Sequence, residues 1–306
     1  MDIAIVTDST ASLPSELVAR HGIRVVPLHV QVDGDDPGEG VDGSPTRLVT
    51  AMRAGTGAHT SRPAPGAFLR AYEEAAAGGA DAVLSVHISG ELSATVEGAQ
   101  LAARQSPVPV EVVDSRVLGM ALGYAVLSAV DAASRGASVT EAAQVARSRA
   151  AAASTVVYVD TLEHLRRGGR IGAASAWLGS ALAIKPLLGL DDGRIVPLEK
   201  VRTASRAISR MEQRSVTAAE AATGPGSSGE GVDIAVHHLD SEDRATDLLE
   251  RLRSSVRSAR EVRLVELTAV VGAHVGPGTI AVVVSPRPAP WHPGGPEADA
   301  PVAPGR

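Results

Sequence analysis

Short apolar runs alternate with longer amphipathic or small-residue segments through the first half of the chain. Each run has the length and β-branched content of a strand buried on both faces, and the segment after it predicts a helix. Gly22 and Gly136 follow two of these predicted helices, where glycine is the usual stop signal. Alternating strands and helices predict an α/β fold with a parallel sheet. The apolar runs are Ile3–Val6, Ile23–Val32, Ala82–Ile88, Val110–Val113 and Thr155–Val159.

The pattern changes after about Val159. The sequence Asp191-Asp192-Gly193 predicts a hairpin turn, and the later apolar runs combine hairpin-like strands with helices, which is typical of a mixed or antiparallel sheet. We therefore predict two α/β domains, an N-terminal domain over residues 1–158 and a C-terminal domain over residues 159–286. Residues 287–306 are rich in Pro, Gly and Ala, which predicts a disordered tail.

Polar side chains follow several predicted strands at the point where each strand ends. Asp8, Ser9 and Thr10 follow the first strand, and Asp114 and Ser115 follow a later one. Ligands of parallel sheets bind at the carboxyl ends of the strands. These loops therefore predict a polar floor along one edge of the sheet.

Hydroxyl side chains in two further loops are candidates for binding an anion. Thr60 and Ser61 precede a helix predicted from about residue 65, and Ser93 and Thr95 stand between the run Ala82–Ile88 and the next helix. Such hydroxyls serve either as helix N-caps or, with the free N–H groups of the helix, as a receptacle for a carboxylate or phosphate. The sequence leaves both roles open.

Three arginines, Arg166, Arg167 and Arg170, surround the pair Gly168-Gly169. They fit the end of a helix, a contact with an anion or a partner protein, or an RNA-binding element. Aromatic residues make up only 2% of the chain and the formal charge is −6. Both values argue against nucleic-acid binding, which relies on stacking aromatics and an excess of basic residues.

His274 opens the sequence His274-Val275-Gly276-Pro277-Gly278, which predicts a tight turn before the apolar strand Thr279–Val284. A histidine in such a turn either binds an acid group or has a structural role. His237 and His238 are adjacent in a predicted strand, so their side chains point to opposite faces and are poorly placed to share a metal. No metal site is predicted.

Composition excludes several classes of protein. The 306 residues include no cysteine, which rules out disulfides, thiolate zinc sites and a cysteine nucleophile. The first residues have neither the basic region nor the long apolar run of a signal peptide, and no apolar run is long enough to cross a bilayer. We expect a cytoplasmic, monomeric protein with no stable membrane insertion.

Several motifs, taken in order, resemble those of the DegV family, the fatty-acid-binding subunits of bacterial fatty acid kinase. The resemblance spans roughly residues 2–286 and is specific because many short motifs occur in the same order. The motifs include IVTDSTASLP at residues 5–14, TSRPAPGAF at 60–68, ISGELSATVEGA at 88–99, VDTLEHLRRGGRI at 159–171 and HVGPG at 274–278.

The resemblance implies a long-chain fatty acid in a buried apolar tunnel between two α/β domains. Its carboxylate would be bound by hydroxyl groups, with Thr60 and Ser93 at the family's carboxyl-binding positions and Ser61 and His274 nearby. The aliphatic composition suits such a tunnel, since each buried methylene contributes about 0.8 kcal/mol. The family usually has Gln where this chain has Arg62, and Gly where it has Ala94.

The resemblance also implies a partner protein. A separate kinase subunit would phosphorylate the bound carboxylate with ATP to give an acyl phosphate, so the chain itself would be a carrier without a cofactor. Arg170 and Arg202 match family arginines near the head group or the surface that faces the kinase, and we assign Asp8, Ser9 and Thr95 to the head-group loops or that same surface. The alternative is a hydrolase or phosphatase that uses the same hydroxyl-rich edge with His274.

Overall fold

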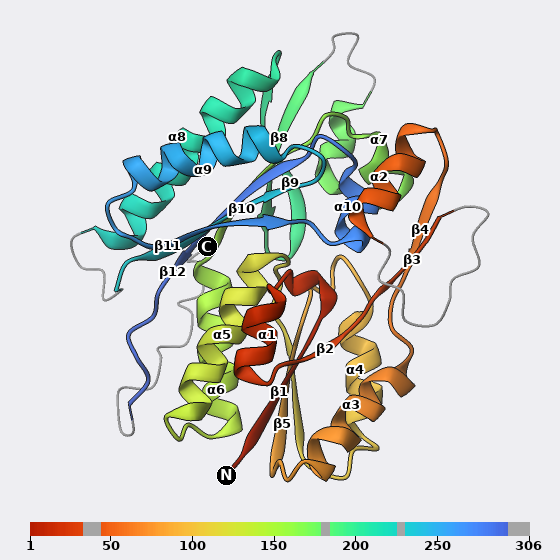
Figure 1. Ribbon diagram of the computed structural model, residues 1–306, viewed down its shortest axis with the longest axis vertical. Coiled ribbons are helices and arrows are strands. Elements are labelled where there is room, and N and C mark those ends of the chain that lie inside the picture. The colour runs from red at the N-terminus through yellow and green to blue at the C-terminus, as the bar shows by residue number, and fades with distance from the viewer. Residues whose placement is uncertain (33–43, 179–183, 225–229, 293–306) are drawn as a thin grey trace, which may run out of the picture.

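The computed structural model describes residues 1–32, 44–178, 184–224 and 230–292. Two β-sheets with their helices lie one above the other in Figure 1, and a two-stranded ribbon joins them at one side. The predicted α/β class, with a parallel N-terminal sheet and a mixed C-terminal sheet, is confirmed.

The first sheet is entirely parallel and has the strand order β2-β1-β5-β6. Helices α3 and α4 cover one of its faces, and α5 and α6 cover the other. Both faces are therefore buried, as the continuous apolar runs predicted. The elements are β1 (Ile3–Asp8), η1 (Ser9–Ala11), α1 (Ser15–His21), β2 (Arg24–Val26), α3 (Pro65–Ala77), β5 (Ala82–His87), α4 (Thr95–Ala103), β6 (Val110–Asp114), α5 (Met120–Ser134) and α6 (Val139–Ala152).

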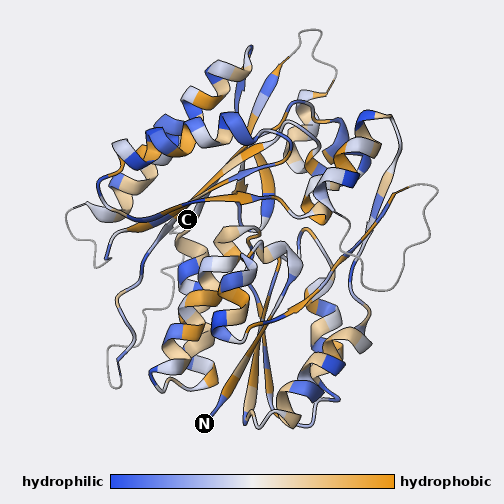
Figure 2. Cartoon of the chain, viewed as in Figure 1, coloured by the Kyte–Doolittle hydropathy of each residue, from blue (hydrophilic) through white to orange (hydrophobic). Residues whose placement is uncertain are grey.

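The second sheet has the order β11-β10-β12-β7-β8-β9, in which only β10 and β11 pair in parallel. Side chains on β12 alternate: Ile280 and Val282 pack with α8 and α9, whereas Val283 packs toward α5 and α6. Figure 2 shows these central strands as largely hydrophobic, with hydrophilic residues on the outer surfaces of α8 and α9. The elements are β7 (Ser154–Tyr158), β8 (Lys185–Asp191), β9 (Arg194–Val201), α8 (Ala204–Thr223), β10 (Val232–His238), α9 (Glu242–Ser255), β11 (Ala259–Glu266) and β12 (Ile280–Pro286).

A ribbon from the N-terminal half packs against a short helix from the C-terminal half. Strands β3 (His29–Val32) and β4 (Ala58–Ser61) pair in antiparallel fashion, and together with α2 (Pro45–Arg53) they cover α10 (Ala269–Val275). The contact is apolar, with Leu28, Val30, Leu48, Ala269 and Val270 at its centre. The remaining elements, α7 (Glu163–Arg167) and η2 (Gly172–Trp177), lie beside α10 and β9.

Some sequence predictions are corrected by the structure. The predicted strand Ile23–Val32 is two strands in two different sheets, because Pro27 has no N–H to donate to a ladder and the chain changes direction there. His274 lies in the last turn of α10 and not in the predicted tight turn. Strand β4 and helices α2, α6 and α10 were not predicted.

We predicted a domain boundary after residue 158. That boundary would assign β7 to the first domain, although β7 pairs with β12 and β8 in the second sheet. The ordered chain also continues past residue 286: Arg287 bonds Asp233, and Trp291 packs against the core around α5. Residues 293–306 of the predicted tail lie outside the described residues. Otherwise the division into domains stays a prediction.

A buried ion pair ties α6 to the second sheet. Arg149 is only 7% exposed and pairs with the carboxylate of Asp233, which also accepts a bond from Arg287 at 2.8 Å. The same guanidinium donates to Ser128 Oγ at 2.7 Å and Ser285 Oγ at 3.0 Å. Because α6 also covers the first sheet, this pair helps to fix the two sheets relative to each other.

Removal of the Asp233 carboxylate should be costly because it leaves the Arg149 charge buried without a partner. We expect Asp233→Ala to lower the free energy of unfolding by about 3–5 kcal/mol, measured by urea denaturation. The control is Asp131→Ala, which removes the exposed pair with Arg135 and should leave the midpoint nearly unchanged. Equal midpoints for the two variants would contradict a stabilising role for the buried pair.

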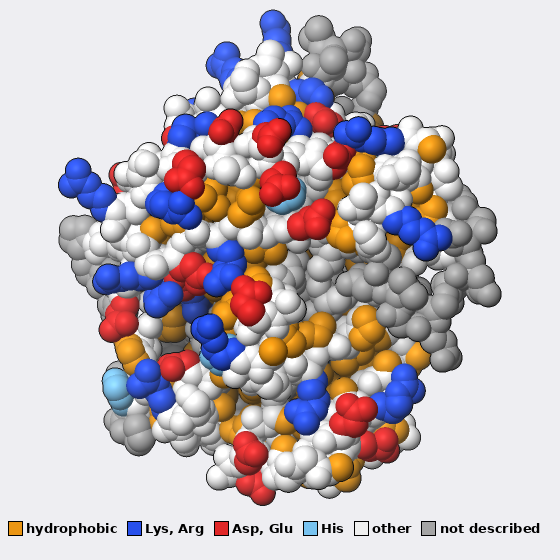
Figure 3. All heavy atoms as spheres, viewed as in Figure 1, with side chains coloured by type: hydrophobic (Ala, Val, Ile, Leu, Met, Phe, Trp, Pro, Cys, Tyr) orange, Lys and Arg blue, Asp and Glu red, His pale blue; other side chains and the backbone are white. Residues whose placement is uncertain are grey.

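Two surface properties bear on the sequence predictions. No helix in the described ranges is long and apolar enough to cross a membrane. On the face shown in Figure 3, basic and acidic side chains are interspersed and do not form a continuous basic stripe. This face therefore lacks the electrostatic footprint that nucleic-acid binding requires.

Candidate functional site

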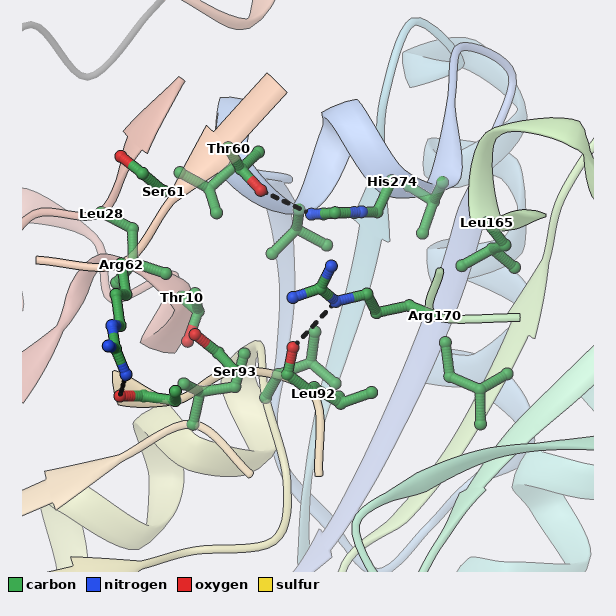
Figure 4. A pocket seen from close by; sticks show the side chains of 17 residues that line it. Thr10, Leu28, Thr60, Ser61, Arg62, Leu92, Ser93, Leu165, Arg170 and His274 are labelled. Atoms are coloured by element: carbon green, nitrogen blue, oxygen red, sulfur yellow. Dashed lines mark hydrogen bonds between the residues drawn. The ribbon is translucent and has the colours of Figure 1, made fainter. Parts of the chain in front are cut away.

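A cavity of about 180 Å³ lies where the two halves of the molecule meet. Its walls come from the β3–β4 ribbon, the loop between β5 and α4, the segment after α7, and α10. Polar side chains gather in one part of the wall, whereas Leu28, Ile88, Leu118, Val271 and Val275 line much of the rest. Figure 4 shows this arrangement, with Thr60, Ser93, Arg170 and His274 turned toward the same space.

Thr60 and His274 meet in this cavity although they are 214 residues apart in sequence. Thr60 Oγ1 lies 2.8 Å from His274 Nε2. The β3–β4 ribbon carries Thr60, α10 carries His274, and the apolar contact between these elements fixes the distance. The predicted proximity of Thr60 and His274 is therefore present in the structure.

The surroundings of His274 set its charge. Burial, and secondarily the charge of Arg170, lowers the pKa of His274 to about 4, so the ring is neutral at pH 7. Its Nδ1 has no hydrogen-bond partner among the described atoms and lies against Gly168, where a Cβ would overlap it. The Nε2 atom therefore makes the hydrogen bond by which the ring is held, to Thr60.

A neutral histidine allows two directions for this hydrogen bond. In the tautomer with the proton on Nε2, His274 donates to Thr60 Oγ1, and the Thr60 hydroxyl hydrogen is free to point into the cavity. Thr60 is then a donor to whatever occupies the site. Such a donor suits a carboxylate, which when ionised accepts hydrogen bonds only.

The loop between β5 and α4 supplies the second hydroxyl, Ser93. Its Oγ lies 2.8 Å from Thr95 Oγ1, and the N-cap of α4 is Ala94, which has no side chain to cap the helix. The loop is held from outside, since Ser89 Oγ donates to the carbonyl of Gly193 in the β8–β9 turn at 2.8 Å. Neither Ser93 nor Thr60 is an N-cap, so the capping alternative was wrong for both; Thr60 and Ser61 are strand residues.

Two arginines flank the same loop through its carbonyl groups. Arg170 Nε donates to Leu92 O at 3.0 Å, and Arg62 Nη1 donates to Ala94 O at 3.2 Å. Neither guanidinium lies within 4.0 Å of a carboxylate in the described part of the chain. Both line the cavity and supply positive charge to it. Arg62 and Ala94, the two departures from the family pattern, are thus bonded to each other.

Asp8 turns away from the cavity and ties two strand ends together. Its carboxylate accepts bonds at 3.0 Å from the N–H groups of Thr10 and Ile88 and lies 3.0 Å from His87 Nδ1. Thr10 and Ile88 then line the cavity floor. Of the residues predicted to form a polar floor at this edge of the sheet, only Thr10 lines the cavity, and Asp8 fixes its position from beneath.

The chain matches known proteins over most of its length. A family model described as "Uncharacterised protein, DegV family" matches residues 2–287. The chain belongs to the DegV family. The DegV domain-containing protein SCO2569 of Streptomyces coelicolor is 50% identical over 285 residues, which cover 93% of this chain and 99% of the relative.

Solved DegV structures share the fold. The DegV family protein of Thermus thermophilus, described by its fatty acid binding, has a TM-score of 0.83 and 35% identity, and the match covers 94% of this chain and all of that one. DegV of Bacillus subtilis, described as a fatty acid binding protein, has a TM-score of 0.83 and 30% identity, with the same coverage of both chains.

The other predicted site residues of this DegV protein differ in how they lie relative to the cavity. Asp8, Ser9 and Thr95 are buried, so they do not face a partner protein. Ser61 lines the cavity but is exposed, and Figure 4 shows it at the outer margin. Arg202 is exposed after β9 and does not line the cavity. The assignment of ligand contacts to individual residues stays a prediction.

Thr10 and Arg62 line the cavity but were absent from the predicted ligand contacts. The signal for Thr10 was its place in the polar run after the first strand. The signal for Arg62 was its departure from the family pattern next to Thr60. Both signals were visible in the sequence but did not indicate which way the side chains point.

A second, apolar cavity of about 60 Å³ adjoins the first. The two share five aliphatic wall residues. The inner face of the second sheet adds Val157, Ala281 and Val283 to its wall. The shared residues are Leu118, Leu165, Ile195, Val271 and Val275.

A set with the connectivity of a hydrolase triad is also present, but it lies in the core. Ser85 Oγ is 2.6 Å from His87 Nε2, and His87 Nδ1 is 3.0 Å from Asp8. All three side chains are 0% exposed, Ser85 is also bonded to Tyr72 at 2.9 Å, and neither Ser85 nor His87 lines the cavity. A substrate has no access to this serine.

The fit between Gly168 and His274 predicts the behaviour of the ring. Gly168→Ala would place a methyl group on Nδ1 and push the ring toward solvent, so the pKa of His274 should rise from about 4 toward its ordinary value of about 6.5. A histidine NMR titration measures this change. The control is Gly66→Ala on α3, where a Cβ meets nothing closer than 3.9 Å. An unshifted midpoint in Gly168→Ala would contradict the desolvation of His274 by this contact.

Proposed function

We propose that this protein binds a long-chain fatty acid, with the acyl chain in the apolar cavity and the carboxylate at Thr60 and Ser93. The observation that carries the proposal is that the two cavities adjoin: hydroxyl side chains line the first, aliphatic side chains line the second, and five aliphatic residues belong to both walls. A fatty acid has the same division into one polar end and one apolar chain.

The energetics favour this ligand. Each methylene buried in the apolar cavity contributes about 0.8 kcal/mol. A buried carboxylate is strongly disfavoured unless its oxygens accept hydrogen bonds. Thr60, oriented as a donor by His274, and Ser93 meet this need, and Arg62 and Arg170 offset the negative charge from the cavity wall.

The solved DegV relatives support the same ligand. The proteins of Thermus thermophilus and Bacillus subtilis are each described by their fatty acid binding, and each matches this chain over 94% of its length. We extend their ligand class to this protein for two reasons. The fold is shared, and this chain has a hydroxyl-lined cavity next to an apolar one.

The proposal includes a separate ATP-dependent kinase subunit as partner. A carboxylate oxygen of the bound acid attacks the γ-phosphorus of ATP, ADP leaves, and the product is an acyl phosphate. The carrier needs no cofactor in this scheme, and the chemistry belongs to the kinase. The exposed side chains of Arg62 and Arg170 beside the cavity indicate where a partner reaches the head group.

The alternative hydrolase or phosphatase is less well supported. A triad needs a third group that orients the histidine, and Nδ1 of His274 has no such partner among the described atoms. Turnover of simple esters or phosphate esters, lost in His274→Ala, would favour this alternative over a carrier.

Ligand binding is tested first by native mass spectrometry of the purified protein, which should show a bound mass of fatty-acid size. Ser93→Ala should then weaken fatty-acid affinity by about 1.5–3 kcal/mol, or roughly 10- to 150-fold, because a hydrogen bond to a charged group is lost. Ser134→Ala, an exposed hydroxyl on α5, is the matched control. Equal affinities for the two variants in a titration would remove Ser93 from the site.

The kinase-facing role of Arg202 predicts a different pattern. Because Arg202 is exposed and outside the cavity wall, Arg202→Ala should retain fatty-acid affinity but lower acyl phosphate formation with the kinase by about 10-fold or more. Arg104→Ala, at the end of α4, is the control for loss of a surface charge. Full turnover by Arg202→Ala would place the kinase on another surface.

A further inference from the structure

A third cavity of about 360 Å³ adjoins the polar end of the site. It shares Thr60, Arg170 and His274 with the first, hydroxyl-lined cavity, which we call the head-group cavity. These three residues therefore lie between the two spaces. The apolar cavity shares five other wall residues with the head-group cavity. The hydroxyl-lined cavity therefore adjoins both of the others.

The lining of the third cavity is basic and rich in donors. His59, His164, Arg167, Arg170 and His274 contribute to its wall, together with a turn that contains Gly55 and Gly57. Among the described residues, no aspartate or glutamate lines it, and Met52, Ala58 and Ala273 add apolar surface. The basic part of this lining is suited to an oxyanion.

Charge in this lining exceeds what a carboxylate needs. Arg166 and Arg167 share the single carboxylate of Glu163, with bonds of 2.6 and 2.8 Å, so the trio retains a net positive charge. Within the part of the chain that the structure describes, Arg170 bonds carbonyl groups alone, at Leu92 and Gly168. His164 and His274 are neutral at pH 7, since burial lowers the pKa of each, and so act as hydrogen-bonding groups.

Packing fixes the two histidines of this wall. His274 lies against Gly168 of the segment after α7, and His164 of α7 lies against Gly276 at the end of α10; a Cβ on either glycine would overlap the ring. Each ring thus fills the space left by a missing side chain on the opposite element. The wall is built from a rigid pairing of α7 with α10.

We propose that this third cavity is a phosphoryl subsite: it holds the phosphate of an acyl phosphate while the carbonyl stays at Thr60 and the acyl chain stays in the apolar cavity. This inference rests on the proposed function. The ligand is a tetrahedral phosphate oxyanion bonded to the fatty acyl carbonyl. Arg167 lines the third cavity but not the first, so it would contact the acyl phosphate and not the unphosphorylated acid.

The test compares two ligands with the same acyl chain on the delipidated full chain by calorimetry: the fatty acid, and a β-ketophosphonate in which CH₂ replaces the bridging oxygen of the acyl phosphate. Arg167→Gln should weaken the β-ketophosphonate by about 10-fold and leave the fatty acid unchanged. Arg166→Gln is the matched control, because Arg166 shares Glu163 but does not line the cavity, and it should alter neither ligand.

The outcomes separate the two levels of the proposal. Failure of the fatty acid to bind the wild type would overturn the proposed function itself. Fatty-acid binding with no difference between Arg167→Gln and Arg166→Gln toward the β-ketophosphonate would overturn the phosphoryl subsite alone. ATP added without an acyl ligand distinguishes the source of the phosphate: Arg167-dependent ATP binding would assign the cavity to the phosphate donor and overturn the chain-borne phosphoryl group.

Discussion

The contact between Thr60 and His274 is the constraint on which the site depends. It joins a ribbon that leaves the first sheet to a helix that belongs to the second, and its length of 2.8 Å is set by the apolar packing of α2, β3 and β4 on α10. If that packing loosened, the two side chains would lose the hydrogen bond that orients them toward the cavity. The polarity of the head-group site is thus a consequence of aliphatic contacts made several residues away.

Two glycines are as important to this site as its polar side chains. Gly168 and Gly276 let two histidine rings lie flat against backbone, and the resulting desolvation keeps His274 neutral. A charged imidazolium at this position would attract an acid more strongly, but a neutral ring next to Thr60 gives direction without adding charge. Positive charge comes instead from Arg62 and Arg170, whose bonds to carbonyl groups hold them at the edge of the cavity.

The sequence predicts the first sheet well because its strands are buried runs that end in polar residues, so β1, β5 and β6 lie within the predicted ranges or within one or two residues of them. Prediction from sequence fails where contacts between distant residues determine the structure. Pro27 marks the break between β2 and β3, but the pairing of β3 with β4 comes from residues about thirty apart. Helix α10 has seven residues, five of them Ala or Val, and is followed by Gly276, a pattern that does not separate it from a strand and turn. Hydroxyls at strand ends identify candidate ligands, whereas only family resemblance associates Thr60 with His274.

The groups around the head-group cavity fit the reversible binding of an acid that we propose. A bidentate arginine clamp would hold a carboxylate tightly and reduce its nucleophilicity. Here both arginines already donate to backbone carbonyls of the β5–α4 loop, so part of their hydrogen-bonding capacity is occupied, and the hydroxyls of Thr60 and Ser93 give weaker, neutral donors. Such a set satisfies a buried acid but leaves an oxygen able to react. This balance is the one a carrier requires if its cargo is to be modified while it is bound.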